Sequence, residues 1–251
     1  MAGCALLAHF LLLKKRPRNG GTCALIIAAV TLLGSAQAGQ PADDVVAYEL
    51  TLKSPSGAVL PEVRLLDRPI IAAEVNRDLN ALASGLACPK RTKYTVPLAY
   101  RSRASVTYAA NDVLSVSVHA AYNCGGAYPT NDANVSMTYD LESGERVPFE
   151  LLFADYRRDE ARIVRVLLPA LRAAGMIFSE QCAGVLTAEN LSSYGFAYSL
   201  SRAGLTVQPN FPHAIEACSQ GATVPFRHLR AFARADGVLA RVAHAERRHA
   251  P

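Results

Sequence analysis

Two long strand-like segments constrain the fold of this chain more than any other feature. Residues 98–109 and 113–122 both have the composition of β-strands, and Asn111-Asp112 between them favours a tight turn. In the second segment every other residue is apolar, whereas two serines and His119 take the alternate positions. The sequence therefore predicts a long antiparallel hairpin with one apolar and one polar face.

The other elements predict an α+β fold. Apolar residues at helical spacing predict helices over 69–86 and 157–174. Asp67 and Asp155 are placed to cap them, and Pro169 is expected to kink the second. Further strands are predicted at 48–52, 134–141, 145–149, 194–199, 205–208 and 222–226. Strands and helices occur in runs rather than in strict alternation, so we expect antiparallel sheets with helices packed on one side.

The first residues have the pattern of a secretory signal peptide. Four basic residues between positions 14 and 18 precede an apolar run of 11 residues, Cys23–Leu33, and Ala36-Gln-Ala38 fits the small-residue cleavage pattern. The alternative is a membrane anchor, but a spanning helix needs about 20 apolar residues. We expect residues 1–38 to be cleaved, no transmembrane anchor to remain, and the protein to be periplasmic.

The basic charge of the chain belongs largely to this leader. Residues 1–38 hold four of the 26 basic residues and none of the 21 acidic ones, so the remainder has a formal net charge of +1. Nucleic acid is therefore not an expected partner. The stretch from Arg227 onward is a local exception with six arginines, and we expect a solvated helical tail over 236–251. The alternative is a patch that contacts an anionic surface, such as cell-wall polymer or lipid headgroups.

Four cysteines follow the leader, and an even number in an exported chain predicts disulfides. Three pairings are possible. The nearest-neighbour pairs, Cys88–Cys124 and Cys182–Cys218, need the least chain closure, and each closes a loop of about 36 residues that stabilises by roughly 3–4 kcal/mol. The spacing matches no zinc pattern, so we expect neither a metal nor another cofactor.

Catalytic motifs are absent from the sequence. There is no nucleophile elbow, no HExxH, no phosphate-binding loop and no dinucleotide fingerprint. His119 and Asp132 could form a pair that orients a base, although a half-exposed strand histidine is more often structural. His213 and Glu216 could supply two metal ligands on a helix, but the neighbouring prolines favour a turn. Binding is therefore a better expectation than catalysis.

The best candidate for a binding surface is the loop after the long hairpin. It contains a Gly-Gly pair that permits unusual backbone conformations, and Tyr128 offers a large apolar area with a polar tip. Tyr122 and Tyr139 flank the loop, and the alternative is that both are core aromatics, which is the favoured interpretation for Tyr139. We expect the partner-binding residues to be Asn123, Gly125, Gly126, Tyr128 and Asp132.

Several motifs in order along the chain resemble a bacterial family. They are residues 113–118, 125–129, 139–144, 151–153, 212–221 and 224–226, with Leu229. The chain resembles the extracytoplasmic domain of the RsiV anti-sigma factor, a lysozyme receptor, which is also attached to some peptidoglycan deacetylases. The resemblance covers residues 39–235. The family often has His where this chain has Tyr128, and Tyr where it has His213 and Cys218.

The resemblance implies an α+β fold at the cell envelope and a protein or peptidoglycan ligand. We expect an exported, non-catalytic binding protein that recognises lysozyme or a cell-wall fragment. The alternative is an envelope hydrolase, or a deacetylase-associated protein, that acts on peptidoglycan. No recognisable nucleophile or metal set is present, which favours the binding protein.

Overall fold

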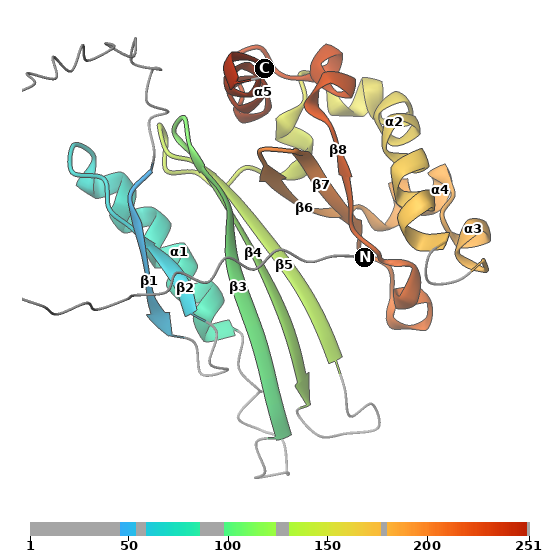
Figure 1. Cartoon of the computed structure of the whole chain (residues 1–251), viewed down its shortest axis with the longest axis horizontal. Helices are drawn as coiled ribbons and strands as arrows, with labels where there is room; N and C mark the ends of the chain where they lie inside the picture. Colours follow the sequence, from blue (N-terminus) through green and yellow to red (C-terminus); the bar gives the residue numbers. More distant parts are fainter. Residues whose placement is uncertain (1–45, 54–58, 86–97, 124–130, 177–179, 250–251) are drawn as a thin grey trace, which may run out of the picture. The chain divides into compact units, whose positions relative to one another are not determined.

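The computed structural model describes residues 46–53, 59–85, 98–123, 131–176 and 180–249 (Figure 1). The chain divides into two units, Met1–Gln40 and Pro41–Pro251, and all described residues lie in the second. The predicted leader, Cys88, Cys124, Gly125, Gly126 and Tyr128 lie outside the described residues.

The described residues form three antiparallel sheets and five α-helices, which confirms the α+β class. The strands are β1 Tyr48–Lys53, β2 Val59–Val63, β3 Leu98–Ala110, β4 Val113–Asn123, β5 Asn131–Asp140, β6 Phe196–Ser201, β7 Gly204–Pro209 and β8 Ala222–Val224. The α-helices are α1 Pro69–Gly85, α2 Tyr156–Met176, α3 Cys182–Val185, α4 Ala188–Tyr194 and α5 Val238–His249. Four short 3-10 helices are η1 Phe149–Leu152, η2 His213–Cys218, η3 Phe226–His228 and η4 Arg230–Phe232. The sheets are β1-β2, β3-β4-β5 and β6-β7-β8.

The predicted long hairpin is present and forms two strands of the β3-β4-β5 sheet. β3 and β4 pair through Asn111 and Asp112, whose φ angles of 52° and 55° are the left-handed values that a two-residue type I′ turn requires. The turn is tied to the start of α1, because the guanidinium of Arg68 donates to Asp112 Oδ1 at 2.5 Å and to the Leu141 carbonyl at 3.0 Å. Local turn chemistry and a tertiary contact therefore agree on the register of the sheet.

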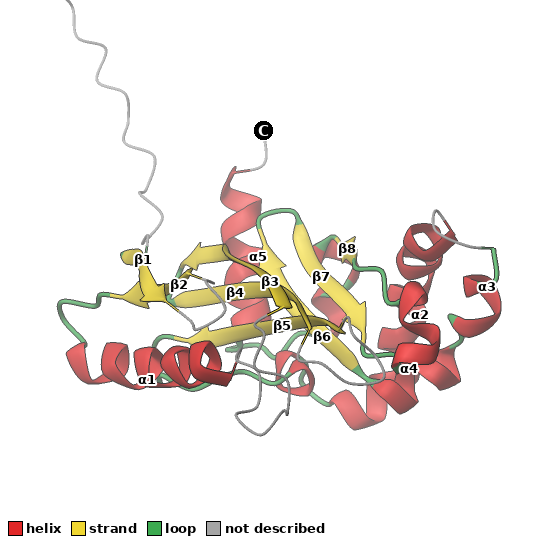
Figure 2. Cartoon of the chain, turned by 90° about the horizontal axis from the view of Figure 1, so that it is seen from below, coloured by secondary structure: helices red, strands yellow, loops and turns green. Residues whose placement is uncertain are grey.

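The apolar face of the central sheet packs against α1 and β2. Figure 2 shows α1 lying along one side of the sheets. The shared core consists of Leu60, Val63, Val75, Leu79, Leu114, Val116, Val118, Ala120, Met137, Tyr139 and Leu141, among others. Asn76 joins the helix to the strand, because its side chain bonds both the N–H and the C=O of Val63 at 2.8 and 3.0 Å.

The second face of the central sheet is covered at one end by β6. Ser115, which the alternation places on a polar face, is fully buried. Its hydroxyl accepts the N–H of Leu200 at 3.0 Å and lies 3.0 Å from Thr138 Oγ1. The buried polar groups are thus hydrogen-bonded, as burial of a polar group demands. The other end of this face carries the site discussed below.

Two local predictions need correction. The strand predicted at 145–149 is an isolated bridge between Tyr139 and Arg146, followed by η1. Pro148 has no N–H to continue a ladder, and Phe149 turns into the core instead. The predicted helix 157–174 is present as α2 and continues through Pro169 to Met176. Asp155 caps it as expected, since its Oδ1 accepts the Arg158 N–H at 3.1 Å.

The C-terminal helix α5 belongs to the core rather than to a solvated tail. Val238, Leu239 and Val242 are buried against the second hydrophobic cluster, which also contains α2 and the β6-β7-β8 sheet. Arg241 of α5 is paired with Asp140 at 2.7 Å and with Glu142 at 2.9 Å.

Among the helices in the described part of the chain, none is both long and apolar enough to cross a membrane.

Candidate functional site

The open end of the central sheet presents a ladder of polar side chains. The strand register places Ser117 opposite Ser136 and His119 opposite Asn134. The two serine hydroxyls are 3.5 Å apart, and His119 Nδ1 is 2.7 Å from Asn134 Oδ1. Side chains directly opposite on one face of an antiparallel pair meet in this way. The polar positions predicted from the alternation in β4 are therefore assembled into one surface.

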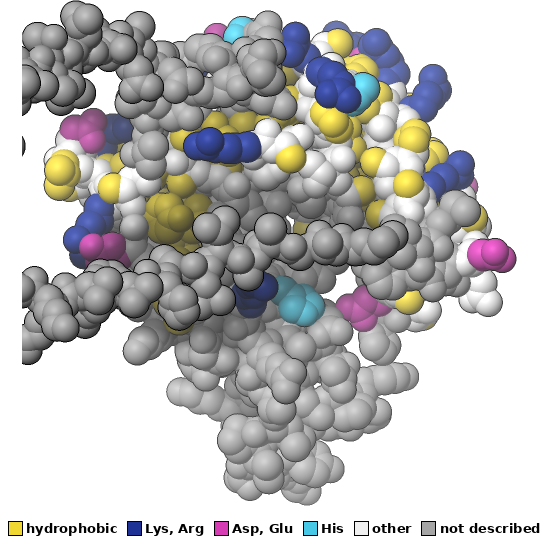
Figure 3. All heavy atoms as spheres, in the orientation of Figure 1, with side chains coloured by type: hydrophobic (Ala, Val, Ile, Leu, Met, Phe, Trp, Pro, Cys, Tyr) yellow, Lys and Arg dark blue, Asp and Glu magenta, His cyan; other side chains and the backbone are white. Residues whose placement is uncertain are grey.

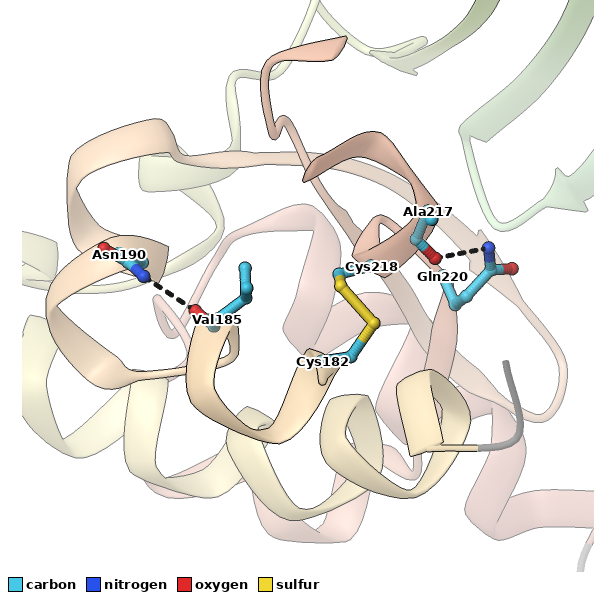
Figure 4. The surroundings of a disulfide bond; sticks show 6 residues. All are labelled: Cys182, Val185, Asn190, Ala217, Cys218 and Gln220. Atoms are coloured by element: carbon cyan, nitrogen blue, oxygen red, sulfur yellow. Dashed lines mark hydrogen bonds between the residues drawn. A yellow bond between two sulfur atoms is a disulfide. The ribbon is translucent and has the colours of Figure 1, made fainter. Parts of the chain in front are cut away.

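The wall facing this ladder is η2, held by a disulfide. Cys182 of α3 and Cys218 of η2 are joined, with their Cα atoms 5.3 Å apart (Figure 4). Both cysteines are buried. Just beyond the bridge, the Gln220 amide donates to the Ala217 carbonyl at 3.1 Å and closes a compact turn. The disulfide thus anchors the segment that carries the next residues of the site, and it confirms the predicted second pair.

Between the two walls lies a cleft of about 540 Å³. It is lined by His119, Asn134, Gln208, Glu216, Ala217, Ser219, Gln220 and Gly221. This volume falls in the range of small-ligand sites. The lining offers imidazole, amide, carboxylate and hydroxyl groups, which together can both donate and accept hydrogen bonds.

Ser219 is the most informative residue of the cleft. Its side chain is only 7% exposed, and its hydroxyl has no hydrogen-bond partner among the described residues. Buried polar groups in native proteins are nearly always hydrogen-bonded, so such a group requires an explanation. Ser219 borders the cleft, but its hydroxyl has almost no accessible surface, so the side chain must rotate before this hydroxyl can reach a ligand.

A second hollow adjoins the cleft along β5. Its volume is about 250 Å³, and its lining includes Asn134, Ser136, Arg146, Tyr198 and Asn210. Asn134 is part of the lining of both hollows. The Tyr198 hydroxyl donates to the Val147 carbonyl, and burial raises the pKa of this phenol well above its usual value. Tyr198 is therefore a neutral, fixed part of this wall.

The histidine in the cleft is held in one orientation. In neutral His119, Nδ1–H donates to the Asn134 amide oxygen, which leaves Nε2 as the available acceptor. Asn134 is thus the partner of Nδ1 of His119. The backbone of Asp132 lies opposite Ala121 in the strand register, and the suggested pairing of its side chain with His119 stays a prediction. An oriented imidazole acceptor suits ligand binding as well as base catalysis.

The structure places the other predicted residues only in part. Asn123 is the last residue of β4, and Asp132 lies within β5. The loop with Gly125, Gly126 and Tyr128 lies outside the described residues, so its role stays a prediction. Tyr139 is a core aromatic, as its alternative interpretation held, and its hydroxyl donates to Asp78 at 2.8 Å.

Sequence reasoning missed most of the cleft. His213 and Glu216 were considered as metal ligands, whereas Glu216 lines the cleft from a 3-10 helix. Within the described ranges, no three His, Cys, Asp or Glu side chains gather into a possible metal site. Gln208 and Ser219 carried no signal, because nothing local distinguishes them from other surface polar residues.

Comparisons with known proteins find similar solved structures only. No protein-family model and no curated protein matches the chain. A crystal structure of a DUF3298 family protein from Pseudomonas aeruginosa PAO1 is similar, with 12% identity, coverage of 76% of this chain and 92% of that one, and a TM-score of 0.41. A member of the DUF3298 family from Bacteroides fragilis NCTC 9343 is also similar, with 13% identity, coverage of 80% and 99%, and a TM-score of 0.42.

Proposed function

We propose that this chain is an exported, non-catalytic binding protein of the cell envelope, and that its cleft takes a polar glycan fragment of the cell wall. The observation that carries the proposal is the polar lining of the cleft, whose imidazole, amide, carboxylate and hydroxyl side chains can both donate and accept hydrogen bonds. Ser219 borders this cleft with a buried hydroxyl that has no partner among the described residues, and a ligand could satisfy it once the side chain rotates toward the cleft.

The chemistry of the lining favours a glycan. Asn134, Gln208 and Gln220 bring amides that donate and accept at the same time. Cell-wall sugars carry hydroxyl and N-acetyl groups, which need both kinds of partner. No arginine or lysine is among the described residues of the larger hollow, so its lining does not favour an anionic ligand.

The shape of the site favours a chain over a single small molecule. The two hollows share Asn134, and the smaller one is also lined by Ser136 of β5. An extended oligosaccharide could occupy both, whereas a compact metabolite would fill only one. The disulfide between Cys182 and Cys218 supports an oxidising compartment, in agreement with the predicted signal peptide.

Titration calorimetry with soluble peptidoglycan fragments tests the proposal. Ser219→Ala should weaken binding by about 2- to 10-fold, the effect of one hydrogen bond, without lowering the melting temperature. Stability is expected to hold because the substitution removes a buried polar group that has no protein partner in the described structure. Ser193→Ala, which removes an exposed hydroxyl on α4 outside the cleft, is the matched control.

Lysozyme is the second ligand for the same experiment, because the resemblance implies it. Failure of every cell-wall fragment to bind would overturn the glycan assignment. A lysozyme complex with the same affinity for wild type and Ser219→Ala would move recognition to a surface outside the cleft.

A further inference from the structure

The exposed side of α2 is a row of arginines. Arg157, Arg158, Arg162, Arg165 and Arg172 are all exposed, and helical spacing places them within less than half of the helix circumference. The opposite side of α2 is apolar and buried in the core. At 1.5 Å per residue the row is about 22 Å long. It is therefore an extended surface and not a pocket.

A second group of arginines continues this surface. These are Arg227 of η3, Arg230 of η4 and Arg234, two residues after η4, and all three are exposed. The two groups adjoin, because the guanidinium of Arg162 stacks over the ring of Phe232 in η4 at 4.9 Å. In Figure 3, dark blue side chains gather over the C-terminal 3-10 helices and α2.

Most of this charge has no acidic partner. Asp159 binds Arg158 at 2.8 Å and Arg162 at 2.9 Å. No ion pair to an acidic side chain in the described ranges engages the other six exposed arginines, namely Arg157, Arg165, Arg172, Arg227, Arg230 and Arg234. Arg172 donates instead to the Leu186 carbonyl at 3.0 Å.

The charge is also segregated. Residues 156–172 and 226–236 contain eight arginines and three acidic residues, a formal charge of +5. Residues 39–251 together carry +1, so the remainder of that segment is at −4. A nearly neutral chain thus concentrates positive charge on one surface, which attracts anionic partners across a range set by ionic strength.

We infer that this arginine surface docks the protein on a membrane that contains anionic phospholipids. The planar guanidinium group of arginine matches phosphate oxygens, and several arginines spread over an extended surface suit a layer of headgroups better than one small anion. Leu151 of η1 is 53% exposed and can insert between headgroups. It lies beside the arginines, because the carbonyl of the next residue, Leu152, accepts the Arg234 N–H at 3.3 Å. This inference does not rest on the glycan proposal.

Sedimentation with lipid vesicles tests the inference. We expect binding to vesicles that contain phosphatidylglycerol, weakening as salt is raised, and none to vesicles of phosphatidylcholine alone. Arg165→Gln with Arg230→Gln should lower the partition constant about 25-fold, at roughly fivefold per arginine. Arg77→Gln with Arg103→Gln removes two exposed arginines from α1 and β3 and is the matched control, with less than threefold loss expected.

Equal losses in the two double variants would overturn the inference, because net charge alone would then govern binding. Binding to a soluble phosphate polymer but not to the vesicles would also overturn it in favour of a cell-wall polyanion. Both double variants change only exposed side chains, and their melting temperatures should match that of wild type.

Discussion

Removal of the disulfide between Cys182 and Cys218 should affect both the stability and the site. The bridge closes a loop with a sequence separation of 36 residues. By closing such a loop, the cross-link lowers the conformational entropy of the unfolded chain, which raises the free energy of unfolding by about 4 kcal/mol at 25 °C. Domains of this kind are stable by roughly 5–15 kcal/mol in total, so the loss is large but leaves a folded protein.

Urea unfolding of Cys182→Ala with Cys218→Ala measures this contribution directly. The double variant is preferable to a reductant, because a reductant would also act on the other cysteines of the chain. We expect a fall of about 4 kcal/mol in the free energy of unfolding, or roughly 8–16 °C in melting temperature for a chain of this size. A fall below about 1 kcal/mol would refute the reasoning that the bridge acts through the unfolded chain.

The same variant tests how the cleft is built. Ser219 directly follows Cys218, so the bridge holds this wall of the cleft against α3. The folded double variant should therefore bind any cleft ligand more weakly than wild type, because the loosened segment must be ordered on binding. Unchanged affinity would show that η2 is held in place by its packing alone.

Three further substitutions test the packing and the electrostatics. Gly204→Ala should lower stability by roughly 3 kcal/mol in urea unfolding, because φ is +148° and a Cβ would clash with the carbonyl group of Val224 in β8. Gly221→Ala should have little effect, because no neighbour would lie closer than 3.7 Å to the added Cβ. Tyr139→Phe should cost about 1.5–2 kcal/mol in the same assay, since it removes a hydrogen bond to the Asp78 carboxylate. Hydrogen bonds from Arg158 and Arg162, together with their charges, lower the pKa of Asp159. The ionised carboxylate therefore stabilises the fold above about pH 4, and this effect is lost as the pH falls through the lowered pKa. Asp159→Asn should make stability decline less steeply in acid, and an acid profile identical to that of wild type would contradict this.

The sequence by itself determined the parts of the fold that depend on neighbouring residues. The Asn111-Asp112 turn and the alternation in β4 predicted the central hairpin, because turn geometry and side-chain period are local properties. The cap at Asp155 is local for the same reason. The pairing of Cys182 with Cys218 followed from the short loop that it closes.

The tertiary structure alone decided which surfaces are buried and where the cleft lies. The alternation of polar and apolar residues in β4 predicted that the face with Ser115 is polar. Only the packing of β6 against this face determines that the end at Ser115 is buried and that the end at His119 stays open. α5 is part of the core because distant elements offer it an apolar surface, although its arginines predicted a solvated tail. Ser219 faces a strand ladder about a hundred residues away in the chain, so no local pattern could place it in a site. Contacts between segments that are distant in sequence depend on the whole packing arrangement, which local propensity and periodicity do not encode.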